Sequence, residues 1–261
     1  MESPHNPLVQ QLRKLHRSAF RDKQRQFLVE GPEVVAEALN ANAPLSMLLV
    51  EPGVRPDLVE IARSKSVEVV EVSNAVMKSI TTTRTPQGLV AVCGPIDADP
   101  SELVGRPPTF AVVLSDVQDP GNAGAILRMS RAAGVDAVFL STDSVDLYNP
   151  KLVRATAGAM FSLPVAREVS VPWVLGCLGE RKVLRIAAEA GGSHHYGDVD
   201  MRGPVAIVLG NEARGMTGEV LELCDLRVAI PMEGGAESLN VAAAAAVIAF
   251  EVVRQRRKGR G

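Results

Sequence analysis

The sequence predicts an α/β protein with two domains. Apolar runs of strand length alternate with helical segments along most of the 261 residues, a pattern typical of sheets covered by helices. A stretch rich in proline, glycine and acidic residues at 95–108 separates two such patterns. With 46% hydrophobic and 22% charged residues, the chain has an ordinary soluble composition and enough apolar material for a core.

The first pattern covers residues 1–95 and predicts a small α/β domain with a largely parallel sheet. Its opening segment has helical periodicity, with Leu8, Leu12 and Leu15 on one side and basic residues on the other. Pro32 marks the start of the next helix. The expected elements are a helix at 6–24, a strand at 26–31, a helix at 32–41, and β-rich runs at 45–52, 67–73 and 88–94.

The second pattern covers residues 109–261, and we expect a mostly parallel sheet there, with residues 96–108 as the linker. The alanine run near its end predicts a long helix whose small side chains allow close packing. The expected elements are strands at 109–115, 136–141, 183–188, 204–209 and 227–230, and helices at 122–133, 150–158 and 238–257.

Several classes of protein are disfavoured. Cys93, Cys177 and Cys224 are scattered without a CxxC pair, which indicates neither a zinc site nor a disulfide framework. The adjacent His194 and His195 follow glycines and indicate an exposed loop more than metal ligands. No apolar run approaches ~20 residues, and no hydrophobic signal region opens the chain, so we expect a cytoplasmic protein without membrane spans.

Charge is informative only locally, because the net charge is −2. Two basic clusters stand out, and either could be a solvated surface or a nucleic-acid contact. They comprise Arg13, Lys14, Arg17, Arg21, Lys23 and Arg25 near the start, and Arg254, Arg256, Arg257, Lys258 and Arg260 near the end.

The stretch "QDPGNAGAILR" (118–128) joins a predicted strand to a predicted helix. Asn122 can cap that helix or point into a cleft, and the amides at the helix start favour an anion. Gly124 lies one turn before Arg128, which leaves space for another molecule on the helix surface. The pattern does not fit GxGxxG, which argues against a dinucleotide-binding turn.

Two later stretches also follow strands and carry glycines and polar side chains. They are "LGNEARGM" (209–216) and "IPMEGGAESLNVAAAAAV" (230–247). Because ligands bind open α/β sheets at the carboxyl ends of the strands, these stretches and "QDPGNAGAILR" predict one composite site. No histidine near Ser238 completes a hydrolase arrangement.

The three stretches, in this order and spacing, resemble the motifs of the SpoU (TrmH-type) RNA ribose 2′-O-methyltransferases, members of the knotted SPOUT superfamily. The segment "NPKLVRATAGAMFSLPV" (149–165) is similar to that family's middle segment, and the resemblance covers roughly 109–255. The segments "FLVEGPEVVAEAL" and "TTTRTPQGLVAV" resemble a ribosomal-L30-like substrate-binding domain. The resemblance therefore implies a small L30e-like domain followed by a methyltransferase domain with a C-terminal trefoil knot.

The resemblance implies roles for individual residues. The family's motif residues fall on Asn122, Arg128, Glu212, Ser238 and Asn240, which we take as the catalytic set. The family often has serine where this chain has Ala242, a change that we expect to affect packing more than chemistry. The cofactor implied is S-adenosylmethionine, and the residues expected to hold it are Leu209, Gly210, Asn211, Gly215, Ile230, Met232, Ser238, Leu239 and Asn240.

The resemblance further implies a homodimer that acts on RNA without a metal. Ribosomal RNA is favoured over transfer RNA by the chain length and the L30-like extension, an argument by analogy. Since only 3% of residues are aromatic, we expect recognition by shape and backbone contacts rather than by base stacking. The expected phosphate contacts are Arg13, Lys14, Arg17, Arg84, Arg131 and Arg154.

Arginine serves as a general base in the family's usual account, but a guanidinium does not give up its proton in proteins. We therefore expect Arg128 to remain cationic, grip the adjacent phosphate and stabilise the developing alkoxide. Two other classes stay open at this point: an RNA-binding module without activity, and an NAD-dependent enzyme. A transfer-RNA methyltransferase is the alternative within the family.

Overall fold

The computed structural model describes residues 1–259, so Arg260 of the C-terminal basic cluster lies outside the described residues. The contacts divide the chain into two compact units, which we describe separately. Unit 1 contains residues 1–96 and 146–162, and unit 2 contains residues 97–145 and 163–259. The segment 146–162 thus lies in the predicted second domain by sequence position but packs within unit 1.

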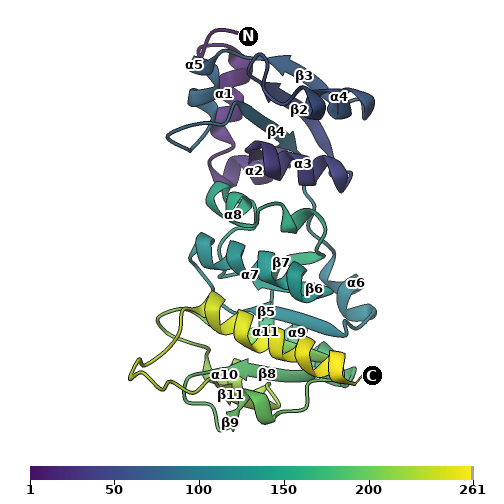
Figure 1. Cartoon of the computed structure of the whole chain (residues 1–261), viewed down its shortest axis with the longest axis vertical. Coiled ribbons are helices and arrows are strands. Elements are labelled where there is room, and N and C mark those ends of the chain that lie inside the picture. Colours follow the sequence, from purple (N-terminus) through teal and green to yellow (C-terminus); the bar gives the residue numbers. More distant parts are fainter. Residues whose placement is uncertain (260–261) are drawn as a thin grey trace. The chain divides into compact units, whose positions relative to one another are not determined.

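Unit 1 is built on a four-stranded sheet with the order β1-β4-β2-β3 (Figure 1). β4 runs antiparallel to both of its neighbours, and only β2 and β3 are parallel, so the largely parallel sheet expected here is wrong. The strands are β1 (Phe27–Glu30), β2 (Leu45–Val50), β3 (Glu68–Glu71) and β4 (Leu89–Cys93). The helices are α1 (Pro7–Lys14), α2 (Ser18–Gln24), α3 (Pro32–Asn40), α4 (Pro56–Ser64), α5 (Asn74–Ile80) and α8 (Pro150–Ala155), and a short 3₁₀ turn, η1, spans Ala159–Phe161.

The single N-terminal helix expected at 6–24 is two helices. α1 ends at Lys14, and α2 begins at Ser18 after Arg17 adopts an extended backbone. Val9, Leu12 and Leu15 are buried against α5 and the sheet, whereas Leu8 is only half-buried. The apolar period therefore predicted the buried face correctly. The sequence did not, however, distinguish helices α4 and α5 from the β-rich runs beside them.

Unit 2 is built on a seven-stranded sheet with the order β7-β6-β5-β10-β8-β11-β9. All of its described strand pairs are parallel, which confirms the expected sheet. The strands are β5 (Phe110–Leu114), β6 (Ala137–Ser141), β7 (Val165–Val169), β8 (Leu184–Ala188), β9 (His194–His195), β10 (Val205–Leu209) and β11 (Leu226–Ala229). The helices are α6 (Pro100–Gly105), α7 (Pro120–Ala133), α9 (Val171–Glu180), α10 (Gly218–Glu222) and α11 (Val241–Lys258), and η2 spans Tyr196–Asp198.

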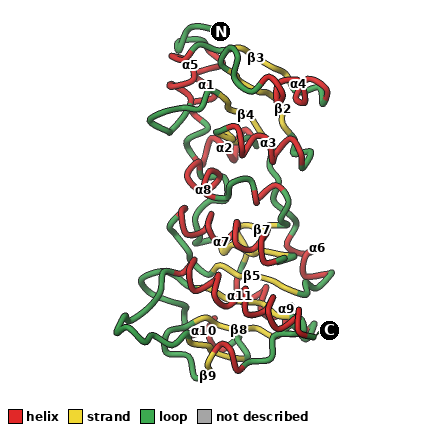
Figure 2. Tube along the Cα trace, viewed as in Figure 1, coloured by secondary structure: helices red, strands yellow, loops and turns green. Residues whose placement is uncertain are grey.

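Helices cover both faces of the unit 2 sheet (Figure 2). Alternate residues of β5 and β10, such as Val113 and Val208, pack in one core with α6, α9 and α10. On the other side α11 packs against β10 and against α7, as its small side chains predicted. Strand β7 and helix α9 were not distinguished in the sequence. The central strands β5 and β10 are buried along their whole length, so their carboxyl ends are held rigidly beneath the loops that follow.

Among residues 1–259, no helix is long and apolar enough to cross a membrane. The same residues contain no group of three or more His, Cys, Asp or Glu side chains placed to hold a metal ion.

Candidate active site

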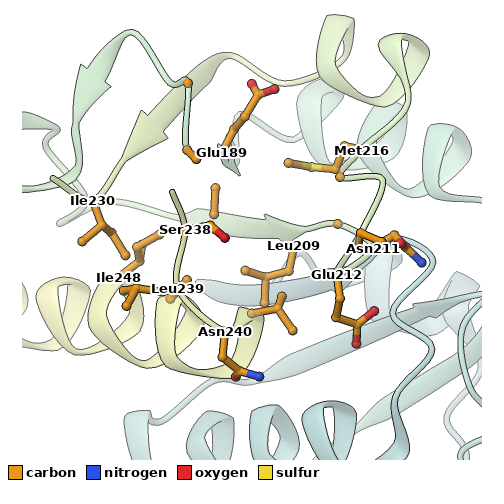
Figure 3. Close-up of a pocket in the computed structure, with 18 of the residues that line it drawn as sticks. Glu189, Leu209, Asn211, Glu212, Met216, Ile230, Ser238, Leu239, Asn240 and Ile248 are labelled. Carbon is orange, nitrogen blue, oxygen red and sulfur yellow. Dashed lines mark hydrogen bonds between the residues drawn. The ribbon is translucent and has the colours of Figure 1, made fainter. Parts of the chain in front are cut away.

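A cavity of about 670 Å³ lies at the carboxyl ends of β8, β10 and β11 in unit 2 (Figure 3). Its walls come from the loop after β8, the turn after β10, the segment after β11 and the start of α11. All nine residues expected to hold the cofactor line this cavity, together with Asn122 and Glu212. The structure thus brings the second and third sequence motifs and the start of the first to one place, as parallel-sheet topology predicts.

Gly210 is a position that only glycine can fill here. A Cβ atom on it would lie 2.6 Å from the carbonyl carbon of Gly215 and 2.7 Å from the Met216 side chain. The reason is a tight hairpin in which the backbone N–H groups of Asn211 and Gly215 donate to each other's carbonyls, at 3.0 and 2.9 Å. Gly215 closes the hairpin with a φ of +68°. The missing side chain lets the hairpin fold back over the end of β10 beside the cavity.

Asn211 fixes this hairpin to the first motif. Its Oδ1 accepts from the backbone of Ala213 and Arg214, both at 3.0 Å, and its Nδ2 donates to the carbonyl of Asp116 at 2.9 Å. The Arg214 guanidinium forms an ion pair with the Asp116 carboxylate at 2.6 Å. Asp116 itself has a φ of +62°, a left-handed backbone that is uncommon for a residue other than glycine.

Three side chains, one from each motif, form a hydrogen-bonded chain. Asn240 donates from Nδ2 to Oδ1 of Asn122 at 2.9 Å, and Asn122 donates from Nδ2 to Oε1 of Glu212 at 2.9 Å. The Glu212 carboxylate also accepts from the backbone N–H of Asp119 at 3.3 Å and of Gln118 at 3.4 Å. We call Asn122, Glu212 and Asn240 the motif network, since it holds the starts of α7 and α11 and the hairpin together.

The electrostatics of Glu212 follow from these contacts. Burial raises the pKa of its carboxyl, but the hydrogen bonds from Asn122 and from backbone amides outweigh burial and hold the pKa below its ordinary value. Glu212 is therefore an ionised acceptor that orders the site, and its lone pairs are engaged by the surrounding donors.

Of the two roles open to Asn122, a helix cap or a residue that faces a cleft, the structure shows the second. The side chain of Asp119, not Asn122, caps α7 by accepting from the N–H of Asn122 at 2.8 Å, and the helix starts two residues earlier, at Pro120. The helix expected at 238–257 begins at Val241, and Asn240 caps it by accepting from Ala242 and Ala243 at 2.9 and 3.3 Å. Ser238 lies in an exposed segment that borders the cavity. Asn122 is thereby free to serve the motif network instead of the helix backbone.

Arg128 is exposed on α7 and does not line the cavity. Among residues 1–259 its side chain has no hydrogen-bond or ion-pair partner, so the guanidinium is available to an incoming group. Gly124 is buried, so the open surface expected beside it is wrong: this part of α7 is covered within the unit. The other predicted buried positions of α7 are confirmed, and they are Ala123, Ile126, Leu127, Ser130 and Ala133.

The residues expected to contact RNA are divided between the units. Arg13, Lys14 and Arg17 are exposed at α1, and Arg84 is exposed in the loop between α5 and β4, all in unit 1. Arg131 is exposed on α7 in unit 2.

Arg154 is half-buried, and its guanidinium is bonded within unit 1. It pairs with Glu30 at 3.0 Å and also donates to the hydroxyl of Thr82. Glu30 is 4% exposed and accepts as well from the backbone N–H of Thr82. Arg154 thus anchors the loop that carries Arg84.

Sequence reasoning missed Asp116, Arg214 and Glu189. Arg214 and Glu189 line the cavity, and Asp116 supports it through the ion pair. A signal existed for each: Glu189 directly follows β8, Asp116 lies two residues after the end of β5, and Arg214 stands before Gly215 in the turn.

The cavity suits a molecule such as S-adenosylmethionine. Its volume lies within the range of ligand sites, roughly 300–1,000 Å³. Leu209, Ile230 and Leu239 give it apolar walls, and the motif network gives it one polar end. The absence of a side chain at Gly210 lets the hairpin lie close against the end of β10, where it forms part of the cavity wall.

Comparison with known proteins identifies this arrangement. The SpoU rRNA Methylase family matches residues 109–250, the part of the chain that contains the cavity and all three motifs. The chain belongs to this family. An MRM3-like substrate binding domain matches residues 6–91.

Relatives are similar over nearly the whole chain. The 23S rRNA (guanosine(2553)-2′-O)-methyltransferase RlmP of Bacillus subtilis is 34% identical over 255 residues, covering 97% of this chain and 98% of its own. The SpoU methyltransferase AviRb from Streptomyces viridochromogenes, solved in complex with the cofactor AdoMet, superposes with a TM-score of 0.88 at 29% identity, covering 97% and 99% of the two chains. An AdoMet-bound rRNA methyltransferase from Sinorhizobium meliloti gives a TM-score of 0.86 at 30% identity and covers 97% of both chains.

These findings confirm the predicted family, the SPOUT-type α/β fold and a methyltransferase activity that depends on S-adenosylmethionine. The trefoil knot and the roles of individual residues stay predictions.

Proposed function

We propose that the protein methylates a ribose 2′-hydroxyl of 23S ribosomal RNA in the cytoplasm. The observation that carries this proposal is the motif network, which joins Asn122, Glu212 and Asn240 beside a cavity of cofactor size. RlmP, a relative that matches along its full length, methylates 23S rRNA at a 2′-oxygen according to its name. The substrate-binding domain matched at residues 6–91 supports an RNA substrate.

S-adenosylmethionine, when bound, supplies an activated methyl group on a sulfonium. Leu209, Ile230 and Leu239 would hold it through apolar contact, and the backbone beside Gly210 would hold it through hydrogen bonds. The main task of the protein is then to place the ribose oxygen in line with the methyl group, a contribution that can reach about 7–11 kcal/mol.

Arg128 has the second task. Its guanidinium cannot accept the hydroxyl proton, but it can bind the neighbouring phosphate and stabilise the negative charge that develops on the ribose oxygen. Its exposure and its lack of a partner among residues 1–259 support this role. Glu212 is already held by three donors, so it orders Asn122 rather than taking up the proton. As the bond from the ribose oxygen to the methyl carbon forms, the bond from that carbon to the sulfonium sulfur breaks, S-adenosylhomocysteine leaves, and the hydroxyl proton passes to solvent water.

We further propose that the active form is a homodimer. Phe250 on α11 is 48% exposed and Leu239, just before that helix, is 40% exposed, and they are two of the three exposed large apolar side chains among residues 1–259. A second copy that covers this part of unit 2 would bury both. Light scattering coupled to size exclusion tests this, and a monomer at micromolar concentration would contradict it.

The decisive test is methyl transfer to defined RNA. Purified protein, S-adenosylmethionine and an unmodified 23S rRNA transcript should yield one nucleoside carrying a 2′-O-methyl group, detected by mass spectrometry of the digested RNA. An unfractionated transfer-RNA pool serves as the competing substrate. Methylation of a base, or of transfer RNA alone, would overturn the proposal.

A further inference from the structure

The amino-terminal edge of the unit 2 sheet, opposite the cavity, carries an unusual charge distribution. Because the strands are parallel, the loops that enter β5, β10 and β8 meet at this edge, and these strands are neighbours. Each loop brings cations, and the last turn of α11 adds two more. We call this set the basic edge, and its exposed members are Arg106, Arg181, Lys182, Arg202, Arg257 and Lys258.

Hydrogen bonds show that these segments are contiguous. Arg256 donates from Nη2 to the carbonyls of Thr109 and Gly203, at 2.6 and 2.8 Å, which fixes the end of α11 to the entrances of β5 and β10. Arg181 donates to the carbonyl of Gly105 at 3.1 Å, which joins the entrances of β8 and β5. A hollow of about 670 Å³, lined by Arg202 and Arg256 among others, lies at this edge and is separate from the cofactor cavity.

The acidic side chains at this edge are mostly engaged. Asp136 accepts from the backbone of Thr109 and Phe110, and Asp225 pairs with Arg185. Asp200 pairs with Arg202, whose hydrogen bond lowers the pKa of that carboxyl to about 2. Among residues 1–259, by contrast, five members of the basic edge have no ion pair, and these are Arg106, Arg181, Lys182, Arg257 and Lys258. Glu102, Glu180 and Glu222 lie in helices that lead to this edge and have no ion pair among residues 1–259.

The chemistry of the basic edge suits phosphates better than a protein partner. Protein interfaces depend on buried aromatic or aliphatic anchors. The exposed large apolar side chains of the described chain are Trp173, Leu239 and Phe250, and none belongs to the basic edge. Trp173 lies near the start of α9, about 10 Å along the helix axis from its end. Phosphate binding requires only cations placed along the path of a backbone.

We propose that the basic edge binds the sugar-phosphate backbone of the RNA substrate at a second place, apart from the active site. The inference rests on the proposed function, because it takes the partner to be RNA. Strands of five residues separate the two edges by about 17 Å. An RNA helix or hairpin is long enough to reach both edges, so the basic edge adds affinity and orientation without reading sequence.

The test compares two charge-matched double variants of the full-length protein. Lys182→Gln with Arg257→Gln removes two of the six cations of the basic edge, and Arg63→Gln with Lys65→Gln removes an exposed arginine and lysine at the end of α4. The Kd for an unmodified 23S rRNA transcript is measured by filter binding from 50 to 300 mM salt. Titration of S-adenosylmethionine by calorimetry checks that the cofactor site is intact.

Each lost phosphate contact lowers the slope of log K against log salt by about 0.7–0.9. Two lost contacts should therefore lower it by about 1.4–1.8 and weaken binding roughly 25- to 60-fold at 0.1 M salt, while cofactor affinity stays unchanged. The control variant should retain wild-type slope and Kd. The charge-conserving pair Lys182→Arg with Arg257→Lys should restore most of the affinity.

Equal RNA affinity and slope in the basic-edge and control variants would overturn the inference, and so would failure of the charge-conserving pair to restore binding. This outcome is distinct from failure of the proposed function. If the wild-type protein methylates 23S rRNA while the basic-edge variant binds it normally, only the second contact is wrong. If the wild-type protein does not bind 23S rRNA at all, both proposals fail together.

Discussion

Replacing Glu212 by glutamine isolates the acceptor on which the motif network depends. The carboxylate accepts from Asn122 at 2.9 Å and from two backbone amides at 3.3 and 3.4 Å. A hydrogen bond to a charged group contributes about 1.5–3 kcal/mol when well formed and a neutral one about 0.5–1.5 kcal/mol. Two of the three bonds are long and the side chain is exposed, so solvent screens it. We therefore expect Glu212→Gln to lower the free energy of unfolding by about 1–2 kcal/mol.

Calorimetry at pH 7 should show this as a loss of roughly 2–8 °C in the transition of the methyltransferase unit. Asn122 and Asn240 line the cofactor cavity, so a disordered network should also weaken the Kd for S-adenosylmethionine, by at most about 5- to 30-fold if the full 1–2 kcal/mol is expressed in binding. Glu222→Gln is the matched control, since Glu222 is exposed on α10 in the same unit, and we expect it to change stability by less than about 0.5 kcal/mol.

The pH dependence gives a stricter check. The folded pKa of Glu212 lies below its ordinary value of 4.5, so its stabilisation is fully present above that value and is lost as pH falls through the folded pKa. The difference in unfolding free energy between wild type and Glu212→Gln should be constant from pH 7 to 5 and shrink towards pH 3.5. A difference that does not shrink, or a melting temperature at pH 7 equal to that of Glu222→Gln, would refute this account of the network.

Three further predictions concern other parts of the chain. Gly210→Ala places a Cβ 2.6 Å from the backbone of Gly215, so calorimetry should show at least a tenfold weaker Kd for S-adenosylmethionine. Gly176→Ala in α9 is the control, because a Cβ there meets nothing within 4 Å and should leave that Kd unchanged. Arg128→Lys keeps the charge but loses the planar fork, and single-turnover methyl transfer should slow by about 100-fold with an unchanged cofactor Kd; near-normal turnover would contradict the proposed role. Glu30→Ala leaves Arg154 without its carboxylate partner and frees the loop carrying Arg84, so unit 1 should lose about 2–4 kcal/mol of stability. RNA affinity should drop as well. An unchanged affinity for the cofactor is the check that unit 2 is intact.

The order of elements and the location of the site could be predicted because both depend on local patterns. The buried runs at β5 and β10 are continuous and apolar, and each ends at a turn rich in glycine or proline. Parallel-sheet topology then brings the ends of such strands together, whichever residues follow them.

The contacts within the site could not be predicted in this way. That Asp119 rather than Asn122 caps α7 depends on the backbone after β5, where Asp116 adopts a positive φ. The pairing of Glu30 with Arg154 joins residues 124 positions apart, and no periodicity reports such a contact. The reversal of β4 in unit 1 is also non-local, since an apolar strand reads the same in either direction.

The polarity of a parallel α/β sheet gives its two edges different chemistry. Connecting helices begin at the carboxyl edge, where their N-terminal amides and the cavity lie, and they end at the amino edge. Helix ends favour cations by about 0.3–1 kcal/mol each, and Arg106, Arg181 and Arg257 follow or occupy the last turns of α6, α9 and α11. The preference of helix ends for cations explains why cations gather at the amino edge. If helix capping were their only role, neutralising Arg257 would cause a small loss of stability and no change in RNA binding. Lys182 lies beyond the end of α9, so helix capping does not account for it. A marked fall in the salt dependence of RNA affinity in the double variant Lys182→Gln with Arg257→Gln would therefore distinguish a phosphate-binding surface from helix capping alone.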